Sequence, residues 1–121
     1  MNILVVDDSE MMRSIVKQAI QDNAPSTDAV FLEANDGQEA LDQIGASPVD
    51  LVLLDWNMPR LDGLSFVKKV RGDGNNVPII MITSITDQEK IMEAGKAGVN
   101  SYLEKPVRGV KLWEQIKEFI Q

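Results

Sequence analysis

Short aliphatic runs alternate in this sequence with longer stretches in which apolar side chains recur every three or four residues. Three runs are almost wholly aliphatic; they are residues 3–6, 51–54 and 77–82. Such short runs, each followed by polar or turn-forming residues, are typical of strands buried on both faces of a sheet. Residues 29–34 include the charged Glu33, which suits an edge strand, and residues 102–103 belong to a last short strand.

Helical spacing occupies the stretches between these runs. The first helix has an apolar stripe of Met12, Ile15, Val16, Ala19 and Ile20, and the last has Leu112, Trp113, Ile116, Phe119 and Ile120. Residues able to cap a helix open four of the stretches: Ser9, Asp36 with Glu39, Asp62, and Thr86 with Glu89. The fourth helix is expected to run to Ala97 and end at Gly98, and residues 24–28 and 72–76 are expected to be loops.

Five predicted strands therefore alternate with five predicted helices. This alternation predicts an α/β fold, in which right-handed crossovers build a doubly wound parallel sheet with helices on both faces. The sequence of 121 residues contains no repeat or linker, so we expect one domain over residues 1–121.

Polar residues follow four of the five predicted strands: Asp7 with Asp8, Asp55, Thr83 and Lys105. Taken singly, these residues have simpler explanations as a helix cap, a strand-end hydroxyl or a surface lysine. In an open parallel sheet, however, the carboxyl ends of the strands share one edge, and ligands bind outside that edge. The convergence of these side chains therefore predicts a functional site there.

Composition narrows the classes of function. Twelve basic and nineteen acidic residues give a net charge of −7, which argues against nucleic acid binding, and the basic cluster at residues 68–71 suits the last turn of a helix. The sequence has no cysteine and no histidine, so thiolate and imidazole chemistry cannot come from its own side chains. It shows no signal peptide and no apolar run of roughly 20 residues, so we expect a soluble, cytoplasmic protein without membrane insertion.

The acidic residues predict a site for a hard cation. Three carboxylates in one cleft repel one another, so they cannot all stay ionised unless a cation binds or their pKa values rise. A pocket that offers only oxygen ligands favours Mg²⁺. A carboxylate, a divalent ion, a lysine and a hydroxyl together suit phosphoryl transfer onto Asp55, because the positive charges stabilise the equatorial phosphoryl oxygens.

Three other functions are consistent with parts of this pattern. A Mg²⁺-dependent phosphohydrolase of the haloacid dehalogenase type also uses an aspartate nucleophile, but it places a second acid where this sequence has Asn57. A dinucleotide-binding or flavodoxin-like module needs a phosphate loop after the first strand, where Asp7 and Asp8 would repel a phosphate. A metal-independent interaction domain is the third alternative.

Several motifs resemble those of a known family: Val5-Val6-Asp7-Asp8, Asp55-Trp56-Asn57-Met58-Pro59 with Asp62-Gly63, Thr83, and Lys105-Pro106. Together they resemble the receiver domains of two-component response regulators, over the whole chain. With Tyr102, the sequence is most similar to the single-domain chemotaxis regulators of that family. The resemblance implies a flavodoxin-like (βα)5 fold whose five-stranded parallel sheet has the order 2-1-3-4-5.

The resemblance also implies roles for the strand-end residues. Asp55 would be the phosphoacceptor, and Lys105 would pair with the phosphoryl group. The metal, Mg²⁺ or alternatively Mn²⁺, would be held by Asp8, Asp55 and the backbone carbonyl of Asn57, with Asp7 acting through a bound water. These assignments rest on the family and not on spacing.

Residues around this group are implied to form a switch. Thr83 would move to bind the phosphoryl oxygens, and Tyr102 would then turn from solvent toward the vacated space. The Lys105–Pro106 peptide bond is commonly cis in the family. This sequence departs from the chemotaxis regulators at Ile85, where they have an acid, and at Val107, where an aromatic residue is frequent. We hypothesise that Ile85 screens the acyl phosphate from water or alters access by a phosphatase.

The implied function is a phosphoacceptor switch, most simply in chemotaxis, and not an enzyme that turns over external substrates. The domain would assist its own phosphorylation and dephosphorylation. A CheA-like sensor histidine kinase would supply phosphohistidine, and the surface of the last two helices and the strand between them would bind the flagellar motor switch or another output protein. A phosphatase is a further partner, and a receiver module of a non-chemotaxis or longer regulator is the alternative.

Overall fold

The structure is a computed structural model that describes residues 1–23 and 28–119. Strands and helices alternate in these residues: β1 (Asn2–Val6), α1 (Glu10–Asn23), β2 (Val30–Ala34), α2 (Gly37–Ala46), β3 (Leu51–Leu54), α3 (Gly63–Gly72), β4 (Ile79–Thr83), α4 (Gln88–Ala97), β5 (Ser101–Glu104) and α5 (Gly109–Ile116). The expected loop residues 24–27 and the expected core residue Ile120 lie outside the described residues.

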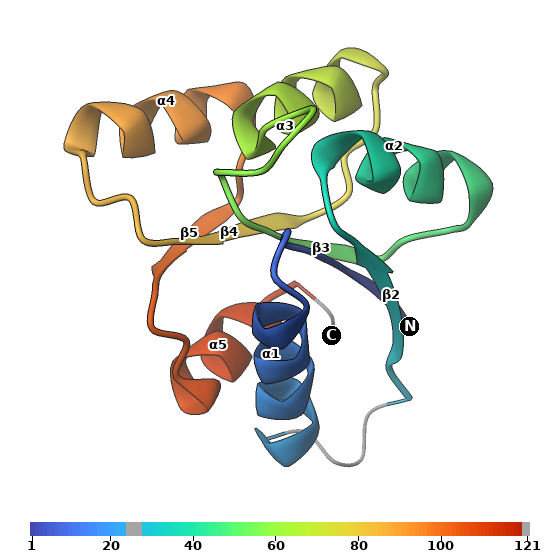
Figure 1. Ribbon diagram of the computed structural model, residues 1–121, viewed down its shortest axis with the longest axis vertical. Helices are drawn as coiled ribbons and strands as arrows, with labels where there is room; N and C mark the ends of the chain where they lie inside the picture. Colours follow the sequence, from blue (N-terminus) through green and yellow to red (C-terminus); the bar gives the residue numbers. More distant parts are fainter. Residues whose placement is uncertain (24–27, 120–121) are drawn as a thin grey trace.

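The five strands form one parallel sheet in the order β2-β1-β3-β4-β5, which confirms the predicted α/β fold and strand order. Helices α2, α3 and α4 cover one face of the sheet, and α1 and α5 cover the other (Figure 1). The chain leaves β1 for one edge and later returns to β3 on the other side of β1. Such a change of direction leaves a crevice at the carboxyl ends of β1 and β3.

The central strand β3 contributes to two separate cores. Val52 and Leu54 pack in the core on the side of α2, α3 and α4, whereas Leu51 and Leu53 pack in the core against α1 and α5. Successive side chains of a strand point to opposite faces, so a strand covered on both faces must be apolar throughout. This is the physical reason for the uninterrupted aliphatic run before Asp55.

Most predicted helix starts agree with the structure. Asp36 and Asp62 cap α2 and α3 through their side chains. The prediction for α4 was wrong by one residue, because Asp87, and not Thr86, is the cap, and its carboxylate accepts the N–H of Glu89 at 2.9 Å. An aspartate is the stronger cap, since its charge also complements the positive end of the helix dipole.

The predicted apolar stripes need two corrections. The apolar spacing predicts that Ile15 belongs to the buried stripe of α1, yet its side chain is exposed, and Val16 and Ile20 provide the buried contacts. Phe119 lies beyond the end of α5 at Ile116, although it still packs against the core shared by α1 and α5.

Candidate functional site

The pairing of β1 with β3 brings two aspartates together. Val6 is in register with Leu54, so the next residues, Asp7 and Asp55, leave the sheet side by side. The backbone ladder continues past the strands, because the N–H of Asp55 donates to the carbonyl of Val6 at 3.0 Å. Asp7 and Asp55 are both buried. Two buried carboxylates in adjacent positions require a positive partner.

Lys105 supplies that positive charge from the end of β5. Its Nζ lies 3.0 Å from Asp7 Oδ2 and 3.4 Å from Asp55 Oδ2. Its backbone N–H donates to the carbonyl of Thr83 at 2.9 Å, which ties the end of β5 to the end of β4, and the Lys105–Pro106 peptide bond is cis. Burial lowers the pKa of Lys105, but its hydrogen bond with Asp7 and the charge of Asp55 outweigh burial, and the pKa is raised. The side chain is therefore a fixed ammonium group at neutral pH.

Asp8 completes an acidic group that suits a metal. Asp7, Asp8 and Asp55 each offer a carboxylate oxygen, and these oxygens lie within 4.8 Å of one another. Burial, the hydrogen bond with Asp7 and the negative charge of Asp7 raise the pKa of Asp8. One ammonium group thus faces three acids, and a donor set made only of oxygen atoms fits a hard divalent cation such as Mg²⁺.

Asp55 is oriented by the residue that follows it. The N–H of Trp56 donates to Asp55 Oδ1 at 2.7 Å, while Oδ2 faces Lys105. Asn57 comes next in the β3–α3 loop, with its side chain exposed. The carboxylate therefore has a backbone donor on one oxygen and an ammonium group near the other, so its direction is fixed before any ligand binds.

The predicted switch residues lie beside this group. Thr83 ends β4 and is fully buried, and its Oγ1 accepts the N–H of Ile85 at 3.4 Å. Tyr102 is half-buried and its hydroxyl donates to the backbone carbonyl of Ile85 at 2.7 Å. Burial raises the pKa of Tyr102, with smaller contributions from the charges of Asp55 and Glu104. In this structure the tyrosine is therefore bound to the β4–α4 loop.

Sequence reasoning missed Arg13, which supports the acidic group from α1. Its Nη1 donates to the backbone carbonyl of Asp7 at 2.7 Å, and its Nε donates to Glu33 Oε1 at 3.0 Å. The side chain of Arg13 is only 14% exposed. The available signal was Glu33 itself, because a partly buried acid in an otherwise apolar strand favours a cationic partner nearby.

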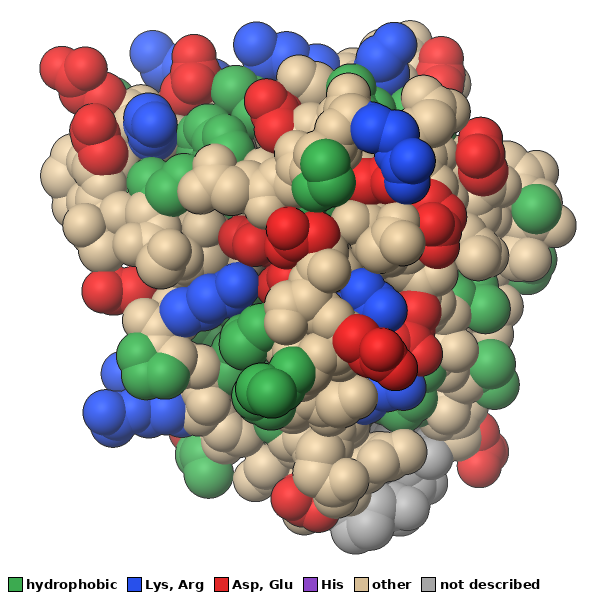
Figure 2. Space-filling model, viewed as in Figure 1, with side chains coloured by type: hydrophobic (Ala, Val, Ile, Leu, Met, Phe, Trp, Pro, Cys, Tyr) green, Lys and Arg blue, Asp and Glu red, His purple; other side chains and the backbone are tan. Residues whose placement is uncertain are grey.

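The surface around the acidic group is mixed in charge. Acidic and basic side chains lie against one another near the middle of one face, between the two layers of helices (Figure 2). Beneath Asp7, Asp55 and Lys105 the free volume is only about 10 Å³, which is too little for more than a single water. A ligand must therefore approach these residues from the solvent side.

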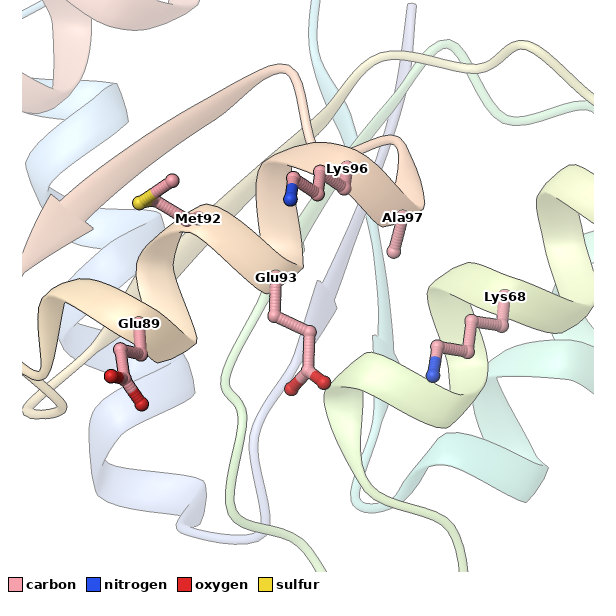
Figure 3. A pocket seen from close by; sticks show the side chains of 6 residues that line it. All are labelled: Lys68, Glu89, Met92, Glu93, Lys96 and Ala97. Carbon is pink, nitrogen blue, oxygen red and sulfur yellow. The ribbon is translucent and has the colours of Figure 1, made fainter.

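A larger groove of about 520 Å³ lies between α3 and α4. It is lined by Lys68, Glu89, Met92, Glu93, Lys96 and Ala97 (Figure 3). Figure 3 shows Glu93 reaching from α4 toward α3, where Lys68 is located. None of the predicted site residues lines this groove, so the chemistry assigned to the strand ends does not take place in it.

The geometry matches what comparison with known proteins shows. Residues 3–117 match the family described as the response regulator receiver domain. The chain belongs to this receiver domain family. Its relatives include chemotaxis protein CheY1 of Helicobacter pylori, 42% identical over 97% of this chain and 94% of the relative. Chemotaxis protein CheY-3 of Vibrio cholerae is 37% identical over 100% of this chain and 92% of the relative.

Solved structures give the same result for the fold. Chemotaxis protein CheY4 of Vibrio cholerae superposes on this receiver domain with a TM-score of 0.86, at 32% identity and 98% coverage of both chains. The receiver domain of the Francisella response regulator 1452 superposes with a TM-score of 0.82, at 30% identity and 98% coverage of this chain. The motifs that suggested the family therefore identified it correctly.

Membership of the family supports coarse statements about function. Receiver domains are signalling switches and not metabolic enzymes, they bind Mg²⁺ at an acidic pocket, and they interact with histidine kinases and output targets. In this chain, Asp7, Asp8 and Asp55 form an acidic group whose carboxylate oxygens are close enough together to hold a metal ion. Within the described residues, 1–23 and 28–119, no helix has both the length and the apolar character needed to span a bilayer.

Proposed function

We propose that this receiver domain, over residues 1–121, accepts a phosphoryl group on Asp55 from the phosphohistidine of a CheA-like sensor kinase in a chemotaxis phosphorelay. The observation that carries the proposal is Lys105, whose Nζ lies 3.0 Å from Asp7 and 3.4 Å from Asp55 beside a group of three carboxylates. Its ammonium group therefore lies where it would pair with the oxygens of a phosphoryl group on Asp55. The chemotaxis assignment is supported by the names of the relatives.

In the proposed transfer, an Asp55 oxygen attacks phosphorus and forms an acyl phosphate. The phosphorus–nitrogen bond of the phosphohistidine breaks, and the imidazole leaves with the electron pair and takes up a proton. Lys105 stabilises the charge on the phosphoryl oxygens by its ammonium group, and the buried hydroxyl of Thr83 becomes a donor to one of them. The imidazole belongs to the partner, because this chain has no histidine.

The proposed metal ligands are Asp8, Asp55 and the backbone carbonyl of Asn57, with Asp7 acting through a bound water. Mg²⁺ bound there, or Mn²⁺ in its place, would neutralise negative charge at the reacting phosphoryl group. The chain's own contribution is the arrangement of acids: the N–H of Trp56 fixes Asp55, and Arg13 holds the backbone of Asp7.

The proposed output is a change at the face formed by α4, β5 and α5. Tyr102 lies on β5, and its hydroxyl bond to Ile85 couples it to the loop that begins at Thr83. A phosphoryl group that recruits Thr83 shifts the balance between two arrangements of this loop, since it interacts differently with each. The altered face then binds an output protein such as the flagellar motor switch, and a phosphatase acts on the same site.

The test distinguishes a switch from a phosphohydrolase. The wild-type protein is incubated with phosphorylated CheA-like kinase and, separately, with a phosphomonoester, each with and without Mg²⁺. We expect one acid-labile phosphate per chain from the kinase, dependent on Mg²⁺, and no sustained release of phosphate from the monoester. Steady turnover of the monoester would favour the hydrolase. If a kinase of another pathway transfers its phosphoryl group faster than the CheA-like kinase does, the domain belongs to a non-chemotaxis or longer regulator.

A further inference from the structure

The β3–α3 loop, residues 56–62, is closed tightly at its base. The N–H of Gly63 donates to the carbonyl of Trp56 at 2.8 Å, so both ends of the loop are joined. A Cβ atom on Gly63 would lie only 2.4 Å from the carbonyl oxygen of Asp55, so the start of α3 is pressed against the chain beside the phosphoacceptor. This loop carries Asn57, whose carbonyl is a proposed metal ligand.

The tip of the same loop is fastened to the start of α2. The N–H of Leu61 donates to the carbonyl of Pro59 at 2.7 Å, around Arg60, whose φ of 65° is left-handed. The N–H of Gly37 donates to the carbonyl of Leu61 at 3.0 Å, and a Cβ atom on Gly37 would lie 2.3 Å from that oxygen. The turn is thus in backbone contact with a second element.

A side-chain ion pair fixes the tip further. The Nε of Arg60 donates to Asp36 Oδ2 at 2.8 Å, and its Nη2 bonds the same oxygen. Asp36 is 0% exposed, and its Oδ1 accepts the N–H of Glu39 at 2.8 Å. The side chain of Arg60 is 67% exposed, so it reaches from solvent onto a carboxylate that α2 already holds in place.

The choice of residue at position 60 is informative. An L-residue in the left-handed region costs about 1–2 kcal/mol, and glycine or asparagine would fit this turn with less strain. The guanidinium group is mostly exposed, but the carboxylate that it pairs with is buried, so removing the arginine would leave the charge of Asp36 without this partner. The ion pair therefore contributes to stability, and it also joins the left-handed turn of the β3–α3 loop to the start of α2.

We propose that Asp36 and Arg60 are positioning residues for the metal site. Their ion pair holds the β3–α3 loop so that the carbonyl of Asn57 and the N–H of Trp56 keep their places beside Asp55. This inference rests on the proposed function, because it assigns Asn57 to the metal. Replacing a residue that contacts a ligand of the metal, and not the metal itself, typically weakens metal binding by about 10–100-fold.

The test measures Mg²⁺ affinity directly, from Trp56 fluorescence in a Trp113→Phe background. Arg60→Gly suits the left-handed turn and removes the guanidinium group, and Asp36→Asn keeps an oxygen that can cap α2 but removes the charge. We expect about 10-fold weaker Mg²⁺ binding in each variant and no further loss in the double variant, because both changes break one pair. Arg60→Lys is expected to restore part of the affinity.

Phosphorylation by phosphoramidate gives a second readout. The Mg²⁺ concentration for half-maximal rate is expected to rise about 10-fold in Arg60→Gly. A purely structural role would lower the urea midpoint without moving this concentration. Lys17→Gln is the matched control, since it also breaks a surface ion pair, with Glu33, and its Mg²⁺ affinity is expected to equal that of wild type.

The Asp8→Asn variant distinguishes a failure of the positioning role from a failure of the proposed metal site. If Asp8→Asn abolishes Mg²⁺ binding while Arg60→Gly and Asp36→Asn bind as wild type, the positioning role is overturned and the proposed metal site stands. If Asp8→Asn also binds Mg²⁺ as wild type does, the proposed function itself is overturned.

Discussion

Asp8 shows how single side chains set the properties of this site. It is the most exposed member of the acidic group, and partial desolvation of its carboxylate together with the neighbouring Asp7 raises its pKa. The protein keeps three acids together although Lys105 neutralises only part of their charge. Repulsion among the three carboxylates lowers the free energy of unfolding when no cation is bound. It also increases the stabilisation that a bound cation provides.

Replacing Asp8 by Asn should therefore weaken Mg²⁺ binding without lowering the free energy of unfolding of the metal-free protein. At a Mg²⁺ concentration 100 times its Kd, the wild-type protein is expected to gain about 2.7 kcal/mol in the free energy of unfolding. Asp8→Asn should lose most of this gain, yet be at least as stable as wild type without Mg²⁺, because repulsion is relieved. Urea unfolding of both proteins with EDTA and with Mg²⁺ measures both effects. An equal gain in the two proteins contradicts the prediction.

Ile85 is a second residue with a predicted individual effect. Its side chain is half-buried in the core next to Tyr102, and it lies in the β4–α4 loop, two residues after Thr83. If it screens the acyl phosphate, Ile85→Glu should shorten the phosphate lifetime several-fold, measured as spontaneous loss of label from purified phosphoprotein. Ile85→Val serves as the control for packing. A lifetime that Ile85→Glu leaves unchanged would dispose of the screening role.

The secondary structure was largely predictable because its signals are local. The aliphatic runs predicted the strands, and Asp36 and Asp62 predicted two helix starts, since a cap needs only neighbouring backbone donors. Thr86 and Asp87 compete for the same role at α4, and sequence spacing alone does not decide between them. Ile15 was misplaced because helical spacing leaves the edge of the apolar stripe uncertain by one residue.

The C-terminal end of α4 is predicted to be a rigid point of the fold. Gly98 has a φ of 116°, and a Cβ atom there would lie 2.8 Å from Arg71, whose guanidinium group donates to the Gly98 carbonyl. Gly98→Ala should therefore cost about 1–3 kcal/mol in urea unfolding. Gly95→Ala, in the same helix with open space around it, should be neutral or stabilise by up to about 1 kcal/mol. Equal effects of the two changes would contradict this assignment.

The contact between β2 and α1 predicts a pH dependence. Hydrogen bonds from Lys17 and then Arg13 lower the pKa of Glu33 from its ordinary 4.5. The folded-state pKa is thus below the unfolded one, so the stabilisation is present above pH 4.5 and is lost as pH falls through the folded pKa. The stability difference between wild type and Glu33→Gln, from urea midpoints at pH 6 to 3, should shrink toward acid pH. A constant difference would be inconsistent with this ion pair.

At the level of the complete fold, topology explains why part of the site was predictable. Asp7, Asp55 and Lys105 are far apart in sequence, but each follows a strand of one parallel sheet, so their meeting follows from the strand order. The supporting pairs, Arg13 with Glu33 and Arg60 with Asp36, depend on which way long side chains turn. Sequence spacing contains no information about those directions, which are set by the packing of the folded chain.

The most direct measurement is the intact mass of the protein after reaction with phosphoramidate and Mg²⁺, followed by location of the modified residue. We expect one acid-labile phosphoryl group per chain, on Asp55, and none in Asp55→Asn or in samples with EDTA. Equal labelling of Asp55→Asn, or labelling that persists without a divalent cation, would contradict this expectation.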